Sequence, residues 1–177
     1  MSDPTELDRR GRRLTDEGRY EEAVALFTRA LEADPGNPSL LYNRGEAYRR
    51  DGRLEEARFD LETVLALEGE SADLLLALGL VAYEADDWEL AVSRYEAALA
   101  LDPGSADAWN DLGVVRFREG KYPEARVCFR KAVELVPAHG EAWFNLHDCL
   151  EELGLDAEAK RAAERLKALG IRPSSED

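Results

Sequence analysis

Residues 106–139 read ADAWNDLGVVRFREGKYPEARVCFRKAVELVPAH, and this 34-residue pattern decides the fold. The pair Leu112-Gly113 inside it recurs at earlier intervals of 34 residues, as Leu78-Gly79, Arg44-Gly45 and Arg10-Gly11. Self-similarity at a fixed period of this length is typical of stacked structural repeats. Because the register never slips, the sequence predicts five units over residues 4–173, which begin at Pro4, Pro38, Ala72, Ala106 and Gly140.

Each unit contains two stretches of helical periodicity separated by a short turn. The turn residues share one register: Gly18, Gly52, Asp86, Gly120 and Gly154. Between units, segments such as 34–38 (DPGNP) place a proline where one helix stops and a capping residue where the next can start. The sequence therefore predicts an all-α fold of ten helices in five antiparallel hairpins, from a first helix over 4–17 to a last over 156–169.

Small residues mark where the two helices of a unit cross. Glycine falls in the first helix at Gly11, Gly45, Gly79 and Gly113, and alanine in the second at Ala23, Ala57, Ala91, Ala125 and Ala159. A glycine inside a helix costs about 1 kcal/mol relative to alanine. Four of them in register therefore indicate that the paired helices approach each other closely.

The fullest version of the pattern, Trp109-x2-Leu112-Gly113, then Ala125-x3-Phe129, then Pro137, resembles the tetratricopeptide repeat. The resemblance implies a right-handed α-solenoid of five hairpins, with residues 1–3 as a stub and 174–177 as a tail. It also implies a concave face lined by the first helices. Three positions depart from the pattern: His147 replaces the glycine of unit five, Gly69 the proline closing unit two, and Ala82 an aromatic residue of unit three. The charged last helix is expected to act as a cap.

Composition excludes several classes of function. The 38 acidic and 23 basic residues give a formal charge of −15, which repels nucleic acid. Eleven acids and one base, Arg94, fall within residues 61–110. The longest uncharged apolar run, Leu74 to Ala82, is too short to cross a bilayer, and the first twenty residues lack the apolar stretch of a secretory signal. We therefore expect a cytoplasmic protein with no membrane insertion.

Residues suited to catalysis are scarce. The histidines are His139 and His147, and the cysteines, Cys128 and Cys149, are interpreted as packed apolar residues. His147 and Cys149 lie two positions apart on one helix and so point in different directions. No phosphate-binding glycine loop or metal-ligand spacing is present. The sequence predicts no enzyme activity, no catalytic residue, no metal and no cofactor.

The resemblance places a partner-binding site in the concave groove. Its expected residues comprise two arginines near the amino-terminal end, three asparagines able to bond a partner's backbone, and an apolar floor with one further tyrosine: Arg12, Arg49, Asn43, Asn110, Asn145, Leu76, Leu80, Tyr83, Val114, Phe117, Phe144 and Tyr42. Two alternatives remain for this set. For the apolar residues, the alternative is that Tyr83 and Phe117 pack beneath a neighbouring helix. For the asparagines, the alternative is that they are ordinary surface residues.

We interpret the chain as a non-catalytic scaffold or adaptor that binds a partner peptide or helix in this groove. Arginines cluster at the amino-terminal end, whereas Asp73, Asp107, Asp111 and Glu141 line the remainder. A partner with basic residues beside an apolar anchor would suit the acidic part. The alternative hypothesis is a self-assembling structural protein, in which a terminal helix or convex face of one molecule enters the groove of another and forms a homo-oligomer.

Overall fold

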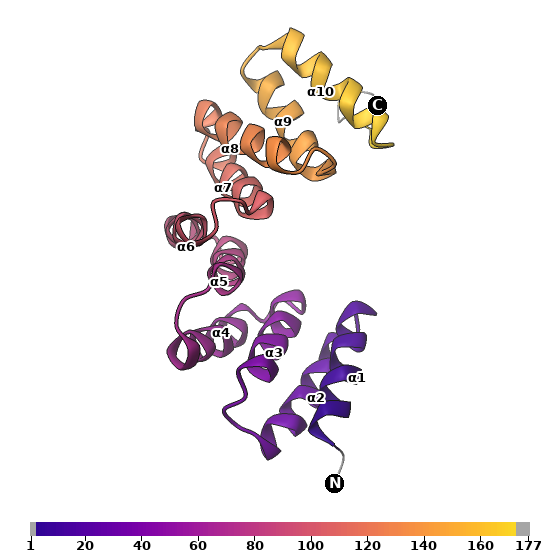
Figure 1. Cartoon of the computed structure of the whole chain (residues 1–177), viewed down its shortest axis with the longest axis vertical. Coiled ribbons are helices and arrows are strands. Elements are labelled where there is room, and N and C mark those ends of the chain that lie inside the picture. The colour runs from indigo at the N-terminus through magenta and orange to yellow at the C-terminus, as the bar shows by residue number, and fades with distance from the viewer. Residues whose placement is uncertain (1–2, 173–177) are drawn as a thin grey trace. The chain divides into compact units, whose positions relative to one another are not determined.

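The structure is a computed structural model that describes residues 3–172. These residues form ten α-helices and no strand (Figure 1): α1 (Pro4–Asp16), α2 (Tyr20–Ala33), α3 (Pro38–Arg50), α4 (Leu54–Glu68), α5 (Ala72–Glu84), α6 (Trp88–Leu101), α7 (Ala106–Arg118), α8 (Tyr122–Leu135), α9 (Gly140–Glu152) and α10 (Asp156–Ala168). The expected all-α fold is confirmed. Residues 1–2 of the predicted stub, the last residue of repeat five and the tail 174–177 lie outside the described residues.

The helices belong to two compact units, Met1–Asp87 and Trp88–Asp177. In the first unit α1 packs on α2 and α3 on α4, while α2 also contacts α3 and α4 contacts α5. In the second unit α7 packs on α8 and α9 on α10, while α6 contacts α7 and α8 contacts α9. Each unit therefore buries its own set of helix faces. The two helices of the third repeat, α5 and α6, fall in different units.

The first helix of each repeat begins after a polar capping residue and ends at the turn residues of the repeat. At the start of each first helix, a side chain accepts a hydrogen bond from a backbone N–H at 3.1–3.3 Å. The accepting side chains are those of Asp3, Asn37, Ser71, Ser105 and His139. The turn inside each repeat has a left-handed residue with φ between +59° and +77°, at Gly18, Gly52, Asp86, Gly120 and Gly154. Glycine adopts this conformation without the Cβ clash that other residues meet. Asp86 is the one non-glycine residue with positive φ in the described chain.

Within a hairpin, a small residue on the first helix faces a large one on the second. A Cβ added to Gly11 would lie 2.6 Å from Phe27 Cε1, and one added to Gly45 would lie 3.1 Å from Leu61 Cγ. Phe27 and Leu61 are completely buried. In repeat five the sizes are reversed: His147 occupies the glycine position and Ala163 the position of the large residue. His147 is 2% exposed, so its ring is part of the packed interior.

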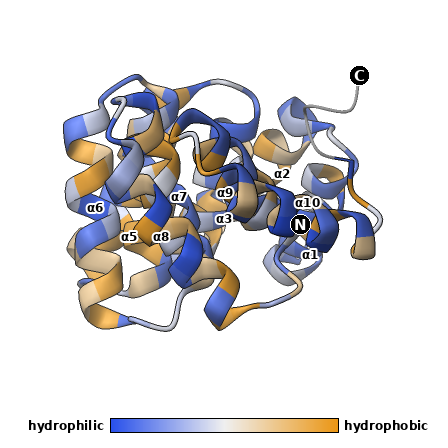
Figure 2. Ribbon diagram, turned by 90° about the horizontal axis from the view of Figure 1, so that it is seen from above, coloured by the Kyte–Doolittle hydropathy of each residue, from blue (hydrophilic) through white to orange (hydrophobic). Residues whose placement is uncertain are grey.

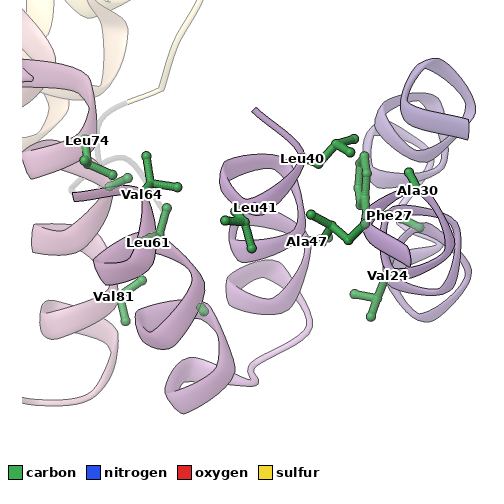
Figure 3. Packing of buried hydrophobic residues seen from close by; sticks show 14 of the residues in the cluster. Val24, Phe27, Ala30, Leu40, Leu41, Ala47, Leu61, Val64, Leu74 and Val81 are labelled. Carbon is green, nitrogen blue, oxygen red and sulfur yellow. The ribbon is translucent and has the colours of Figure 1, made fainter. Parts of the chain in front are cut away.

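The core of the first unit is a continuous apolar cluster on α1 to α5. Figure 3 shows Phe27 of α2 beside Leu40 and Ala47 of α3, and Leu61 and Val64 of α4 near α5. Helix α5 contains the apolar run from Leu74 to Ala82, orange in Figure 2. Among the described residues, no helix combines the length and apolar content needed to span a membrane.

The core of the second unit centres on Phe129 of α8 and on Leu146, Cys149 and Leu150 of α9. Ala162 of α10 closes this cluster. The side chains that form this cluster lie three or four positions apart on each helix, as expected for one buried helical face.

A buried ion pair joins α3 to α4. Arg44 donates from Nε and Nη2 to the two carboxylate oxygens of Asp60, at 2.7 and 2.8 Å, and from Nη1 to Thr28 Oγ1 at 3.2 Å. Asp60 is 1% exposed. The hydrogen bond to Asp60 is the main factor that raises the pKa of Arg44, so the guanidinium remains charged at neutral pH.

Candidate binding surfaces

The first unit has a cleft of about 830 Å³ between α3, α5 and the end of α4. We call it the acidic cleft. Its acidic lining residues are Glu46, Glu68, Glu70 and Asp73, and no basic residue lines it. Its apolar surface comes from Tyr42 of α3, Val64 of α4, and Leu74, Leu76, Ala77 and Leu80 of α5.

The connection between α4 and α5 shapes this cleft. Gly69 ends α4 with φ +82° and ψ −169°, a conformation that essentially only glycine adopts. Ser71 then caps α5 by accepting the Leu74 N–H. Glycine at position 69, where the repeat pattern has proline, thus allows the chain to turn sharply after α4. Glu68 and Glu70, on either side of this turn, line the cleft.

The acidic cleft has a negative potential. Glu46 is bound by Arg49, but Glu68, Glu70 and Asp73 form no ion pair with any residue that the structure describes. Burial raises the pKa of the Tyr42 hydroxyl, and the nearby charges of Glu46 and Asp73 raise it further. Three unpaired carboxylates beside half-buried leucines give this surface both charge and an apolar contact area.

The arginines of the expected site contact acidic side chains of their own unit. Arg12 lies 3.2 Å from Asp8, and Arg49 pairs with Glu46 and Glu84. Burial lowers the pKa of Arg49, but Glu46 and Glu84 outweigh this effect and raise it overall. Arg49 is only 15% exposed, so its charge is largely satisfied within the protein.

The asparagines of the expected site connect first helices of adjacent repeats. Asn43 donates to Asp8 Oδ1 at 2.8 Å, which links α3 to α1. Asn145 donates to Asn110 Oδ1 at 2.9 Å, which links α9 to α7, and Asn110 is 2% exposed. The amide of Asn110 also lies 3.5 Å from Glu141 Oε1. Each of these amides therefore already has an internal partner.

The second unit has a smaller pocket, about 190 Å³, lined by residues of α7, α8 and α9. Val114, Phe117 and Asn145 of the expected site line it, together with Arg118, Phe129 and Asp148. The ring of Phe117 packs on Tyr122 at a centroid distance of 5.1 Å. Phe144 in the second unit and Tyr83 in the first are half-buried and line neither this pocket nor the acidic cleft.

Groups with catalytic or metal-binding chemistry have structural roles here. His139 Nδ1 accepts the Ala142 N–H, so its Nε2 carries the proton and donates to Asp107 Oδ1 at 3.0 Å. Burial raises the pKa of Cys128 and of Cys149 to about 11, which keeps both as neutral thiols.

One group of potential metal ligands occurs within residues 3–172: His147, Asp148 and Glu151, whose donor atoms lie within 4.8 Å of one another. The two ring nitrogens of His147 face different carboxylates, Nδ1 to Asp148 at 3.1 Å and Nε2 to Glu151 at 3.7 Å. One metal ion would bind only one of these nitrogens. Nδ1 lies within hydrogen-bonding distance of Asp148, and Glu151 lies beside Nε2.

These features define an all-helical repeat protein with an acidic, partly apolar cleft. A family model described as tetratricopeptide repeat matches residues 9–73 and 76–127, and a second with the same description matches residues 106–149. The chain belongs to the tetratricopeptide repeat family. No match to its sequence was found among curated proteins.

Solved structures have a similar fold. A crystal structure of MamA is 25% identical in sequence, with a TM-score of 0.77 over 90% of this chain and 94% of that one. A second crystal structure of MamA is also 25% identical, with a TM-score of 0.76 over 94% of this chain and 91% of that one. The crystal structure of YrrB, described as a TPR protein with an unusual peptide-binding site, is 23% identical, with a TM-score of 0.68 over 94% and 86%.

Proposed function

We propose that the protein is a non-catalytic interaction scaffold that binds a partner peptide or helix on the groove side of its first helices. The acidic cleft is the principal site, because it combines a cleft of about 830 Å³ with unpaired charge and apolar area. The partner segment has an aliphatic or aromatic anchor with arginine or lysine on either side. YrrB, which shares the fold, is described as peptide-binding, and this supports a peptide as the class of ligand.

The acidic lining carries this proposal. Glu68, Glu70 and Asp73 are exposed and have no ion pair among the described residues, so a cationic side chain of a ligand can pair with them without breaking an internal contact. Leu76 and Leu80 are both half-buried, so an apolar anchor between them would remove further area from water. Charge complementarity then selects basic over acidic partners. The asparagines and arginines linked to Asp8, Glu46 and Glu84 act as supports that hold α1, α3 and α5 in register.

A titration with two fluorescein-labelled peptides tests the proposal, with anisotropy as the readout. One peptide presents leucines flanked by arginines, and the other replaces every arginine by glutamate. We expect the basic peptide to bind and the acidic peptide not to bind. The double variant Glu70→Lys, Asp73→Lys should weaken binding by at least about tenfold, because it reverses the charge at the cleft.

The matched control is the double variant Glu32→Lys, Glu152→Lys. It makes the same change in net charge, but at exposed positions outside the acidic cleft. Equal weakening by both double variants would show that only net charge matters and would overturn the site. Circular dichroism and thermal melts of each variant establish that the fold is retained.

A further inference from the structure

The second unit has an exposed surface with the chemistry that the acidic cleft should recognise. We call it the α8 surface: Trp109, Val127, Arg130, Lys131 and Glu134, which line a shallow concavity of about 270 Å³. Val127 is 64% exposed. Val127, Arg130 and Lys131 lie three and four positions apart on α8, so they share one face of the helix. An apolar anchor thus lies directly beside two cations.

The charges of the α8 surface are available to a partner. Lys131 has no ion pair with any residue in the described ranges, and Arg130 is only 3.9 Å from Glu134, a weak exposed pair. The equivalent exposed position of repeat two, Phe59, lies between Glu55 and Glu62 on α4. That surface is acidic and would be repelled by the acidic cleft. Phe59 and Val127 are therefore exposed apolar side chains in different charge settings, and the basic setting of Val127 is complementary to the acidic cleft.

We propose that a second copy of this chain is a partner of the acidic cleft, with the α8 surface of one molecule docked against Glu68, Glu70, Asp73, Leu76 and Leu80 of another. This inference rests on the proposed function, since it uses the same cleft. Val127 is the apolar anchor, and Arg130 and Lys131 face the unpaired carboxylates. The contact joins two different surfaces. In an open assembly, the molecule at one end therefore has a free cleft, and the molecule at the other end has a free α8 surface.

The formal charge of −15 opposes association, and the ionic strength decides how strongly. At about 0.15 M salt the Debye length is about 8 Å. Repulsion between remote acidic surfaces is then screened, whereas charges in direct contact still attract. Association is therefore expected to be weak and dependent on protein concentration.

Sedimentation equilibrium of the whole chain over a wide concentration range tests the inference. The wild type should have an average mass that rises above 19.8 kDa with concentration. The cleft variant Glu70→Arg, Asp73→Arg and the α8 variant Arg130→Glu, Lys131→Glu should each associate at least about tenfold more weakly, because like charges then face each other. The chain that carries all four substitutions restores opposite charges and the wild-type net charge, so it should associate again.

Matched controls distinguish this contact from non-specific association. Val127→Ser should weaken association, while Phe59→Ser, which removes an exposed apolar side chain from α4, should leave it unchanged. A wild type that stays monomeric throughout, or a four-substitution chain that stays monomeric while the wild type associates, overturns the inference. Peptide binding is measured at concentrations where the chain is monomeric, so the proposed function can stand when this inference fails.

Discussion

Gly113 on α7 lies against the ring of Phe129 on α8 so closely that a Cβ on the glycine would be 2.6 Å from Phe129 Cε1 and 3.1 Å from Cys128 Cβ. Phe129 is 1% exposed, and its ring is surrounded by the core of the second unit. Because a displaced ring would lose its contacts in this core, helix packing favours glycine at this crossing.

We expect Gly113→Ala to destabilise the protein by about 1–3 kcal/mol from overpacking, partly offset by about 1 kcal/mol of helix propensity. Urea denaturation measures the change. Phe129→Ala alone should cost about 3–5 kcal/mol, and adding Gly113→Ala to it should cost nothing further, because the ring is gone. Gly36→Ala is the control, since no atom lies within 4 Å of a Cβ there. Equal losses for Gly36 and Gly113 would contradict the packing argument.

The buried pair Arg44 and Asp60 gives a second prediction. Asp60→Ala should reduce the free energy of unfolding by about 3–5 kcal/mol, because it leaves the half-buried Arg44 guanidinium without its carboxylate. Replacement of both residues by leucine should be far less costly, since no charge is then stranded. Glu56→Ala, which breaks the exposed pair with Arg53, should cost under about 1 kcal/mol. Denaturation curves that show similar losses for Asp60→Ala and Glu56→Ala would refute this view.

Asp86 gives a prediction in which a substitution raises the stability of the protein. It has φ +59° at a turn where the other four repeats have glycine. Asp86→Gly removes the steric cost of the left-handed conformation and should raise stability by about 0.5 kcal/mol. The reciprocal change Gly120→Ala should lower stability by about 1 kcal/mol. Thermal melts of the two variants should therefore shift in opposite directions, and shifts in the same direction would argue against backbone strain at Asp86.

The buried thiols predict a pH dependence. The pKa values of Cys128 and Cys149 rise from 9.0 to about 11 because burial disfavours the thiolate. The unfolded chain loses these protons first, so their contribution to stability is complete below pH 9.0 and declines as the pH rises towards about 11. The stability difference between the wild type and Cys128→Ala, Cys149→Ala should shrink across this range.

Thiol titration is an independent measurement of the same burial. At pH 8 the native protein should react with a disulfide reagent far more slowly than the urea-unfolded protein, because both thiols are protonated and inaccessible. Rapid reaction of the native protein would show that the cysteines are exposed.

Much of the fold followed from local patterns. The period of 34 residues, the capping residues Asn37 and Ser105, and the turn glycines act over a few neighbouring positions, so the sequence alone predicts where helices begin and end. The resemblance of Trp109, Gly113 and Phe129 to the tetratricopeptide repeat then predicted the family. The same resemblance implied that Leu76 and Leu80 lie in the groove, and in the structure both line the acidic cleft.

Local patterns could not predict which side chains pair between different helices. Asn43 with Asp8 and Asn145 with Asn110 are separated by 35 residues, and whether an asparagine faces a ligand or another helix depends on side-chain distances. The link between Arg44 and Asp60 had no distinctive local signal, because Arg10 and Arg94 show that these two repeat positions hold charged residues in other repeats as well; only the 2.7–2.8 Å contacts establish it.

Period, helix boundaries and charge composition belong to the sequence, because backbone sterics and capping act between near neighbours. Tertiary packing decided which charged groups remain free: Arg49 has acidic partners within its unit, while Glu70 and Asp73 border the cleft with no ion pair among the described residues. The physical reason is that an ion pair depends on a few ångströms between residues far apart in the chain, and only the packed helices set that distance.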